Sequence, residues 1–322
     1  MSVDPNPMPV LAVARLSPLY MSQLSAACEL HVLPDLDSAG LAAVAPRIRA
    51  AAASGDSKVP ADLIAQLPAL QVISVMGVGY DGVDVAAAKA RGVMVTHTPD
   101  VLNDDVADLA LGLMLSTARQ LPAADRFVRS GQWLQGNMPL ARKMSGARVG
   151  IVGMGRIGQA IAHRAQAFGM TIAYTARSAK ADLPHRYLPS AAALAEESDF
   201  LVVITPGGAA TRHLINAEVL AALGRSSPAG GILVNVARGS VVDEAALIDA
   251  LERGVIAGAG LDVFESEPQV PERLRALPQV VLTPHVGSAT QGTRQAMADL
   301  AFTNLQLHLN SQPVRTPVPE CR

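Results

Sequence analysis

Three short segments in the second half of the chain place polar residues directly after apolar runs that are typical of strands. Arg238 follows one run in VNVARGSVVDE, acids follow another in LDVFESEP, and His285 follows a third in LTPHVGSAT. The planar fork of an arginine matches a carboxylate, a histidine can donate a proton near neutral pH, and a nearby carboxylate favours the protonated histidine. Single residues of these types are usually solvated surface charges. The ends of parallel strands, however, meet at one ligand-binding edge of a sheet, so together they could orient a 2-keto acid and protonate its oxygen.

A glycine-rich loop indicates where a hydride donor would bind. The run Gly153-Met154-Gly155-Arg156-Ile157-Gly158 has the pattern G-x-G-x-x-G and lies between an apolar strand-like segment, residues 149–152, and a helical segment. In this context the first glycine allows a tight turn and the second lets a pyrophosphate approach the backbone. The third lets helix and strand pack closely, and the helix N-terminus then faces the phosphates. A purely structural turn is the alternative, but the strand–loop–helix context favours a dinucleotide site.

The choice of dinucleotide should be visible at the end of the next strand, about 20 residues further on, where an acid would bind a ribose 2′-hydroxyl. The segment reads Tyr-Thr-Ala-Arg-Ser up to Ser178, with no carboxylate before Asp182. Arg177 offers a guanidinium and Ser178 a hydroxyl, and both groups suit phosphate oxygens. A solvated surface arginine is the alternative interpretation. The segment predicts a preference for NADP(H) over NAD(H).

The elements that would carry these residues form a βαβ series from residue 147 onward. Strands are predicted at residues 148–152, 171–174, 200–204, 231–235, 258–261 and 280–282, and helices at residues 157–168, 191–197, 217–223 and 244–253. Six strands with intervening helices are what a complete dinucleotide-binding sheet contains. A last helix is predicted at residues 290–309.

The first hundred residues alternate in the same way. Strands are predicted at residues 9–14, 70–76 and 93–96, and helices at residues 60–67 and 83–91. Residues 103–121 should form a helix that is apolar almost all round, which places it at a domain junction or a subunit interface. A chain of 322 residues exceeds the usual size of one hydrophobic core, so two parallel-sheet α/β domains are expected.

Composition excludes several classes of protein. The net charge is −2 without a basic run, which argues against nucleic-acid binding. Cys28 and Cys321 lie near opposite ends of the chain, form no metal-type spacing, and suggest a reducing, cytoplasmic setting without a metal. The N-terminus lacks the pattern of a signal peptide, and the longest apolar stretch, residues 106–118, is too short to span a bilayer, so no membrane association is expected.

Separated motifs along the chain resemble the D-isomer-specific 2-hydroxyacid dehydrogenase family. GMGRIG, VNVARGSVVDE, LDVFESEP and TPHVGSAT match in order, and SVMGVGYDGVD (residues 74–84) and VLNDDVADLALGLML (residues 101–115) fit upstream. The resemblance implies that Arg238, Glu267 and His285 are catalytic. Glu265 is the neighbouring candidate for the acid, but the family pattern places it in the Glu-Pro pair, which favours Glu267.

The resemblance also implies binding roles for other residues. Backbone N–H groups of Val78 and Gly79 would help Arg238 and His285 to hold the substrate, and Asp262 would contact the nicotinamide carboxamide. Further residues match positions that line the cofactor: Thr205, Pro206, Val236, Ala237 and Gly287.

The resemblance implies two Rossmann-like α/β domains, with the cofactor domain inserted into a discontinuous flavodoxin-like one. Residues 1–99 and 290–322 would form the substrate-binding domain and residues 100–289 the NADP-binding domain. The missing ribose acid makes the chain look most like NADP-dependent glyoxylate/hydroxypyruvate reductases, acting on a small 2-keto or 2-hydroxy acid as a homodimer. Alternatives are a hydroxyphenylpyruvate reductase, a phosphoglycerate-type dehydrogenase, and a non-enzymatic dinucleotide-sensing protein. Trp133 would either approach a substrate pocket or anchor a subunit interface.

Overall fold

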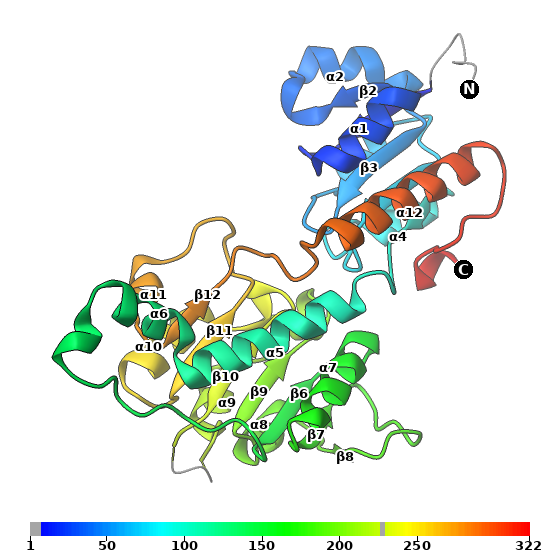
Figure 1. Ribbon diagram of the computed structural model, residues 1–322. Helices are drawn as coiled ribbons and strands as arrows, with labels where there is room; N and C mark the ends of the chain where they lie inside the picture. The colour runs from blue at the N-terminus through cyan, green and yellow to red at the C-terminus, as the bar shows by residue number, and fades with distance from the viewer. Residues whose placement is uncertain (1–7, 226–228) are drawn as a thin grey trace. The chain divides into compact units, whose positions relative to one another are not determined.

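A computed structural model describes residues 8–225 and 229–322 of the chain. It divides into two compact units, of which unit 1 comprises Met1–Leu102 and Thr290–Arg322, and unit 2 comprises Asn103–Ala289. Each unit is built around its own parallel sheet (Figure 1). The predicted fold class, α/β with two parallel sheets, is confirmed.

Unit 1 contains a five-stranded parallel sheet. Its strands are β1 (Pro9–Ala12), β2 (Glu29–Val32), β3 (Ala50–Ser54), β4 (Val72–Met76) and β5 (Met94–Thr96), in the order β2-β1-β3-β4-β5. This is the flavodoxin-type order, in which two consecutive strands exchange places at one edge. The helices are α1 (Pro18–Ala27), α2 (Ser38–Val44), α3 (Ala61–Gln66), α4 (Val85–Ala90) and α12 (Gln291–Leu309).

The C-terminal helix α12 completes unit 1, although almost two hundred residues separate it from β5 in the sequence. It packs on β4 and α1, and the buried hydroxyl of Ser74 in β4 donates a hydrogen bond of 2.8 Å to the Ala301 carbonyl of α12. The unit is therefore discontinuous in sequence.

Two strands of unit 1 were missing from the sequence-based prediction. Residues 50–53 of β3 are four alanines, which favour helices when isolated, yet each is completely buried between β1 and β4. Their small side chains let layers pack closely on both faces of a central strand. The β2 segment is half-buried throughout and lacks an apolar run.

Unit 2 contains a seven-stranded parallel sheet rather than the six strands expected. The strands are β6 (Arg148–Val152), β7 (Thr171–Thr175), β8 (Arg186–Tyr187), β9 (Phe200–Val203), β10 (Ile232–Asn235), β11 (Gly258–Leu261) and β12 (Val280–Leu282). Their order is β12-β11-β10-β9-β6-β7-β8, which is the order of a dinucleotide-binding sheet extended by β12. The unpredicted strand β8 has only two residues, both polar or aromatic, so it carries no periodic signal.

Helix α5 (Asn103–Arg119) begins at the boundary of unit 2 and runs across its sheet beside α7 (Arg156–Ala167) (Figure 1). It packs directly on β10 and β11, where a Cβ on Gly260 would lie 2.9 Å from the Leu113 Cβ. This packing explains much of its apolar character within the unit. The other helices are α6 (Leu121–Arg129), α8 (Ala191–Glu196), α9 (Ala217–Ala222), α10 (Glu244–Glu252) and α11 (Glu272–Ala276).

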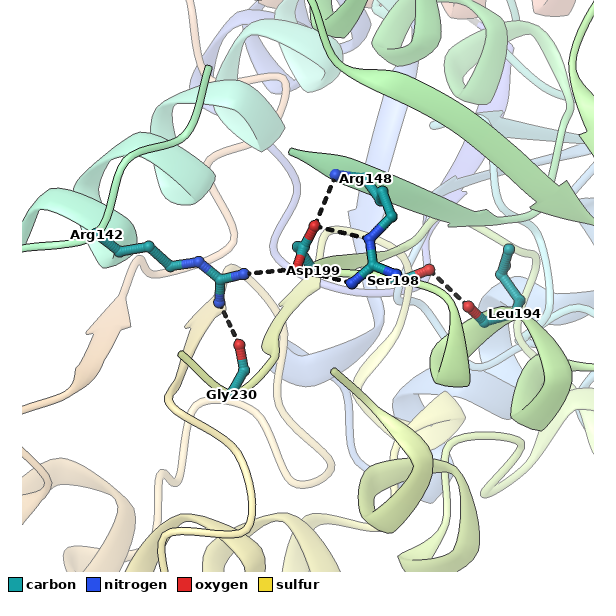
Figure 2. A network of polar contacts seen from close by, with 6 residues as sticks. All are labelled: Arg142, Arg148, Leu194, Ser198, Asp199 and Gly230. Atoms are coloured by element: carbon teal, nitrogen blue, oxygen red, sulfur yellow. Dashed lines mark hydrogen bonds and ion pairs between the residues drawn. The ribbon is translucent and has the colours of Figure 1, made fainter. Parts of the chain in front are cut away.

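A largely buried ionic network ties the amino ends of three strands together (Figure 2). The Asp199 carboxylate, directly before β9, accepts hydrogen bonds from the Arg142 guanidinium at 2.9 Å and from the backbone N–H and side chain of Arg148 at 2.9–3.1 Å. Arg142 also donates to the carbonyl of Gly230, which precedes β10, and lies 5.1 Å from the ring centroid of Phe200. Asp199 therefore fixes the chain segment that enters β6 against β9 and β10.

We predict that Asp199→Ala lowers the free energy of unfolding by about 3 kcal/mol, because two arginines lose the carboxylate that compensates their desolvation. Urea unfolding of the purified protein measures the loss. Asp125→Ala is the control, because Asp125 forms an exposed i,i+4 pair with Arg129 at 2.8 Å, and its removal should cost no more than about 0.5 kcal/mol. Equal losses in the two variants would contradict the role given to Asp199.

Candidate active site and cofactor-binding loops

The candidate residues of unit 2 lie in loops at one edge of its sheet. Because the strands are parallel, the loops that follow β6, β7, β9, β10, β11 and β12 all leave at the carboxyl edge. These loops carry, in chain order, the glycine motif, Arg177 and Ser178, Thr205 and Pro206, Val236 to Arg238, Asp262 to Glu267, and His285 to Gly287. The structure therefore brings these segments to one side of the sheet, as the strand pattern predicted.

The glycine loop has the geometry required for close approach by a phosphate. Gly153 has a φ of +106°, and a Cβ there would lie 2.6 Å from the Ile204 carbonyl oxygen. A Cβ on Gly158 would lie 2.1 Å from the Gly153 oxygen, so strand and helix meet at this glycine. A Cβ on Gly155 would meet nothing within 4 Å. Gly155 is the N-cap of α7, which has no side-chain cap hydrogen bond, so the helix N-terminus after this glycine suits a pyrophosphate.

Arg177 and Ser178 follow β7 and are both exposed. Within residues 8–225 and 229–322, the Arg177 guanidinium has no hydrogen-bond or ion-pair partner. No contact within the described part of the protein therefore gives Arg177 a structural role. An exposed arginine beside a dinucleotide loop fits a phosphate ligand.

The segment after β9 borders the glycine loop. The backbone nitrogen of Thr205 would lie 3.0 Å from a Cβ on Gly153, so the two loops touch. Val236 and Ala237 are buried. The Pro206 carbonyl accepts a hydrogen bond of 2.7 Å from Thr211 Oγ1, which closes its loop.

Arg238 is held by a buried asparagine that the sequence analysis did not single out. The side chain of Asn235, at the end of β10, accepts from the Ala237 N–H at 3.1 Å and donates to the Arg238 carbonyl at 3.0 Å. It therefore shapes the turn that presents Arg238. The detectable signal was a polar residue ending an otherwise apolar strand, three positions before the arginine.

The loop with Arg238 also packs directly against the loop with the candidate acid. A Cβ on Gly239 would lie 1.9 Å from the backbone carbonyl carbon of Phe264. Only a glycine allows this approach, so it sets the separation between Arg238 and Glu267.

Glu267 and His285 form an acid–histidine pair. Glu267 Oε2 lies 2.8 Å from His285 Nδ1, and Glu267 Oε1 accepts from the Phe264 N–H at 2.9 Å. Burial acts to raise the pKa of Glu267, but the bonds from His285 and Phe264 and the charges of His285 and Arg238 outweigh it, so its pKa lies below the ordinary carboxyl value. The carboxylate is therefore ionised at neutral pH and favours a protonated imidazole.

Glu265, the neighbouring candidate, has other partners. One of its carboxylate oxygens lies 2.8 Å from His213 Nε2 and 2.9 Å from Arg212 Nη2. The structure thus pairs His285 with Glu267 and not with Glu265.

Asp262 organises the loop that carries His285. Its buried carboxylate accepts from Thr283 Oγ1 at 2.7 Å and from the N–H groups of Val286 and Gly287 at 2.8 Å each. The His285 N–H donates to the Asp262 carbonyl at 2.9 Å, and His285 has a φ of +52°. The resemblance implied a cofactor contact for Asp262; the structure adds a second task, which is to hold the loop around His285 through the Thr283 side chain before it and two backbone N–H groups after it.

Val78 and Gly79 lie in unit 1, in the loop after β4. Both are half-buried, and within the described residues neither backbone N–H donates a hydrogen bond. Two consecutive donors of this kind suit an anionic ligand. In the described part of the chain no group of three or more His, Cys, Asp or Glu side chains is arranged to hold a metal, and no helix is long and apolar enough to cross a membrane.

Comparison with known proteins identifies the family. The family model of the D-isomer specific 2-hydroxyacid dehydrogenase NAD-binding domain matches residues 111–287. The chain belongs to the D-isomer specific 2-hydroxyacid dehydrogenases. The resemblance inferred from the motifs is therefore confirmed, and the protein is an oxidoreductase of this family.

Relatives within the dehydrogenase family include reductases of small 2-keto acids. Glyoxylate/hydroxypyruvate reductase A of Arabidopsis thaliana is 49% identical over 84% of this chain and 85% of its own length. A hydroxyphenylpyruvate reductase of Plectranthus scutellarioides is also 49% identical, over 86% and 88%. The crystal structure of an NADPH-dependent glyoxylate/hydroxypyruvate reductase from Sinorhizobium meliloti with NADP and malonate has a TM-score of 0.91 at 46% identity, covering 97% of each chain.

We predict that Gly239→Ala destabilises this dehydrogenase by about 2 kcal/mol and lowers turnover of 2-keto acids, because the added methyl group separates the loops of Arg238 and Glu267. Urea unfolding and cofactor-linked turnover measure the two effects. Gly112→Ala is the control, since its Cβ on the exposed side of α5 would meet nothing within 4 Å, and alanine should stabilise the helix by up to about 1 kcal/mol. Full turnover in Gly239→Ala would contradict the packing argument.

Proposed function

We propose that this protein reduces a small 2-keto acid, glyoxylate or hydroxypyruvate, to the 2-hydroxy acid with NADPH. The observation that carries the proposal is the contact of 2.8 Å between Glu267 and His285. This pair lies at the carboxyl edge of the unit 2 sheet, where Arg238 and the glycine motif also lie. Bound NADPH would supply the hydride that reduces C2 of the substrate. The names of the relatives from Arabidopsis thaliana and Sinorhizobium meliloti support the substrate class.

In this proposal, Arg238 and the backbone N–H groups of Val78 and Gly79 hold the substrate carboxylate. A guanidinium binds a carboxylate through two parallel hydrogen bonds, which fixes the direction in which the keto group points. Orientation of this kind lowers the entropic part of the barrier. The positive charge of Arg238 also stabilises negative charge that develops on the keto oxygen.

His285 donates the proton to that oxygen. Its Nδ1 is engaged by Glu267 at 2.8 Å, so the proposal assigns the proton transfer to Nε2. Glu267 stabilises the imidazolium before the reaction and fixes the orientation of the ring. In the direction of oxidation, the same imidazole removes the hydroxyl proton.

Arg177 and Ser178 select NADPH by binding the 2′-phosphate of its adenosine ribose. Arg177 is exposed and has no protein partner among the described residues, and the end of β7 carries no acid; both observations support this assignment. The relative from Sinorhizobium meliloti is named as NADPH-dependent and was crystallised with NADP. In this proposal the other cofactor-lining residues lie in loops at the same carboxyl edge of the sheet: Thr205, Pro206, Val236, Ala237, Asp262 and Gly287.

Two further parts of the proposal concern assembly and a second substrate. Large apolar side chains are exposed along α6 and the segment after it: Leu121, Val128, Trp133, Leu134 and Leu140. A groove of about 500 Å³ with a mixed polar and apolar lining lies in the same unit between α5, α6 and β12. A second copy of the chain would cover the exposed apolar side chains, so we propose a homodimer; a monomer mass in light scattering would contradict it. The relative from Plectranthus scutellarioides makes hydroxyphenylpyruvate the second candidate substrate.

We predict that His285→Ala lowers kcat for 2-keto acid reduction about 10²–10⁴-fold, the usual contribution of general acid catalysis, and leaves the Kd of NADPH within about twofold. Steady-state kinetics and fluorescence titration of NADPH provide the two measurements. Near-normal turnover in this variant would remove His285 from the proton transfer.

Glu267→Gln tests the same pair through its pH dependence. Because the pKa of Glu267 is lowered, its carboxylate stays ionised until the pH falls below the ordinary carboxyl range. It therefore supports the imidazolium throughout neutral pH. In the variant the imidazolium loses this charge and gives up its proton at lower pH, so the alkaline limb of the kcat/KM profile should move down by about one pH unit. An unchanged limb would contradict the pairing.

We predict that Arg177→Ala raises the KM of NADPH about tenfold, the effect expected for loss of a hydrogen bond to a charged group, and leaves the KM of NADH within about twofold. Arg273→Ala is the matched control. Arg273 is exposed on α11, which packs next to β12, and β12 is the last strand on the side of the sheet away from β7. Equal losses with both cofactors would contradict a contact to the 2′-phosphate.

A further inference from the structure

Residues 77–79 form a loop in which two consecutive backbone carbonyl groups each accept a hydrogen bond from residues 97 and 98. The Thr98 N–H donates to the Gly77 carbonyl at 2.8 Å. The ring Nδ1 of His97 lies 3.0 Å from the Val78 carbonyl oxygen, and because that oxygen can only accept, Nδ1 must carry the hydrogen. Adjacent residues 97 and 98 therefore bind adjacent carbonyl groups.

This arrangement fixes the direction of the next two N–H groups. In a planar trans peptide the C=O and the following N–H point in opposite directions. Holding the Gly77 oxygen therefore aims the Val78 N–H to the other side, and holding the Val78 oxygen does the same for the Gly79 N–H. Both N–H groups are without an acceptor in the described residues, and a hydrogen bond at the carbonyl also strengthens the N–H of the same peptide as a donor.

His97 is in turn held by the C-terminal segment. Its backbone N–H donates to the Thr316 carbonyl at 3.1 Å, and Thr316 Oγ1 donates to the His97 carbonyl at 2.5 Å. The fully buried Asn304 of α12 accepts from the N–H groups of Arg315 and Thr316 and donates to Thr316 Oγ1 at 2.7 Å. In Figure 1 this segment, in red, turns back from α12 toward α4.

A second contact joins the same segment to the loop. The Tyr80 hydroxyl donates to the Glu320 carboxylate at 3.1 Å, and the Tyr80 ring meets the His97 ring edge-on with centroids 5.3 Å apart. Burial and the neighbouring Glu320 raise the pKa of Tyr80 to about 12. The hydroxyl therefore stays protonated and remains a donor at any pH at which the protein would work.

We propose that the C-terminal segment, residues 315–320, is a positioning element for the substrate carboxylate, acting through His97 and Tyr80 on the Val78 and Gly79 N–H groups. The inference rests on the proposed function, because it takes those N–H groups to be carboxylate donors. Neither His97 nor the segment touches the substrate. Their effect is to hold two donors in the direction that an anion requires, so that no ordering is needed when the substrate binds.

Two matched substitutions at His97 test the proposal. His97→Leu removes the ring donor, whereas His97→Asn keeps a nitrogen donor at the same number of bonds from Cα. We expect His97→Leu to raise the KM of glyoxylate and the Kd of malonate about tenfold, in line with one lost hydrogen bond. Its kcat and NADPH Kd should stay within about twofold of the wild type, and His97→Asn should restore substrate affinity to within about threefold.

Thr316→Val and Thr316→Ser form an independent pair at the other end of the contact. The valine variant loses the hydroxyl that bonds His97 and Asn304 but keeps the shape of the side chain, and the serine variant keeps the hydroxyl. Thr316→Val should raise the KM of glyoxylate about threefold while Thr316→Ser does not. This pair carries the test if His97→Leu does not fold.

The readouts separate this inference from the proposed function. Malonate binding to the NADPH-loaded protein, measured by calorimetry, needs no turnover, so it still tests the segment if the wild type reduces no 2-keto acid. A folded His97→Leu variant with unchanged glyoxylate KM and malonate Kd would overturn the inference. An equal loss of NADPH affinity would also overturn it, because a general structural defect would affect both ligands.

Discussion

The parallel direction of the strands in unit 2 is the constraint on which the candidate site depends. A parallel sheet delivers every strand end to the same edge, so residues more than a hundred positions apart in the sequence gather without long connections. The strand ends alone would leave the loops free to move. Asn235 and Asp262 remove that freedom, because each is a buried polar side chain at a strand end that hydrogen-bonds the backbone of the loop beside it.

This anchoring holds Glu267 and His285 in fixed positions relative to each other. His285 lies in a left-handed backbone conformation, and the Asp262 carboxylate holds the N–H groups of the two residues that follow it. Glu267 is fixed by the Phe264 N–H and by the close approach of Gly239 to the Phe264 backbone. In the proposed mechanism a proton donor held in this way reaches the same position in every cycle. Glu267 stays ionised because hydrogen bonds and charge outweigh its burial and keep its pKa below the ordinary value. In unit 1, hydrogen bonds likewise fix the direction of backbone donors, since His97 and Thr98 bind the carbonyl groups that direct the N–H groups of Val78 and Gly79.

The sequence predicted the features that have a local signature. Apolar runs followed by polar residues located most strands of unit 2, and the glycine motif located the dinucleotide loop. The alanines of β3 were missed because their strand conformation comes from neighbours on both sides, and β8 was missed because two residues cannot show periodicity. Asn235, His97 and the second task of Asp262 were missed for a related reason. Their importance lies in hydrogen bonds to backbone groups, and in the case of His97 to the distant C-terminal segment, which no residue type or spacing encodes.

We propose above all that the chain uses the carboxyl edge of the unit 2 sheet to reduce small 2-keto acids with NADPH. The most direct measurement is oxidation of NADPH by the purified wild-type protein with glyoxylate, hydroxypyruvate and hydroxyphenylpyruvate in parallel, accompanied by detection of the 2-hydroxy acid formed. We expect rapid NADPH-dependent turnover of glyoxylate or hydroxypyruvate, with stoichiometric product. If NADPH binds but neither these acids nor a wider panel of 2-keto acids is reduced, the claim is contradicted, and a non-catalytic, dinucleotide-sensing role would replace it.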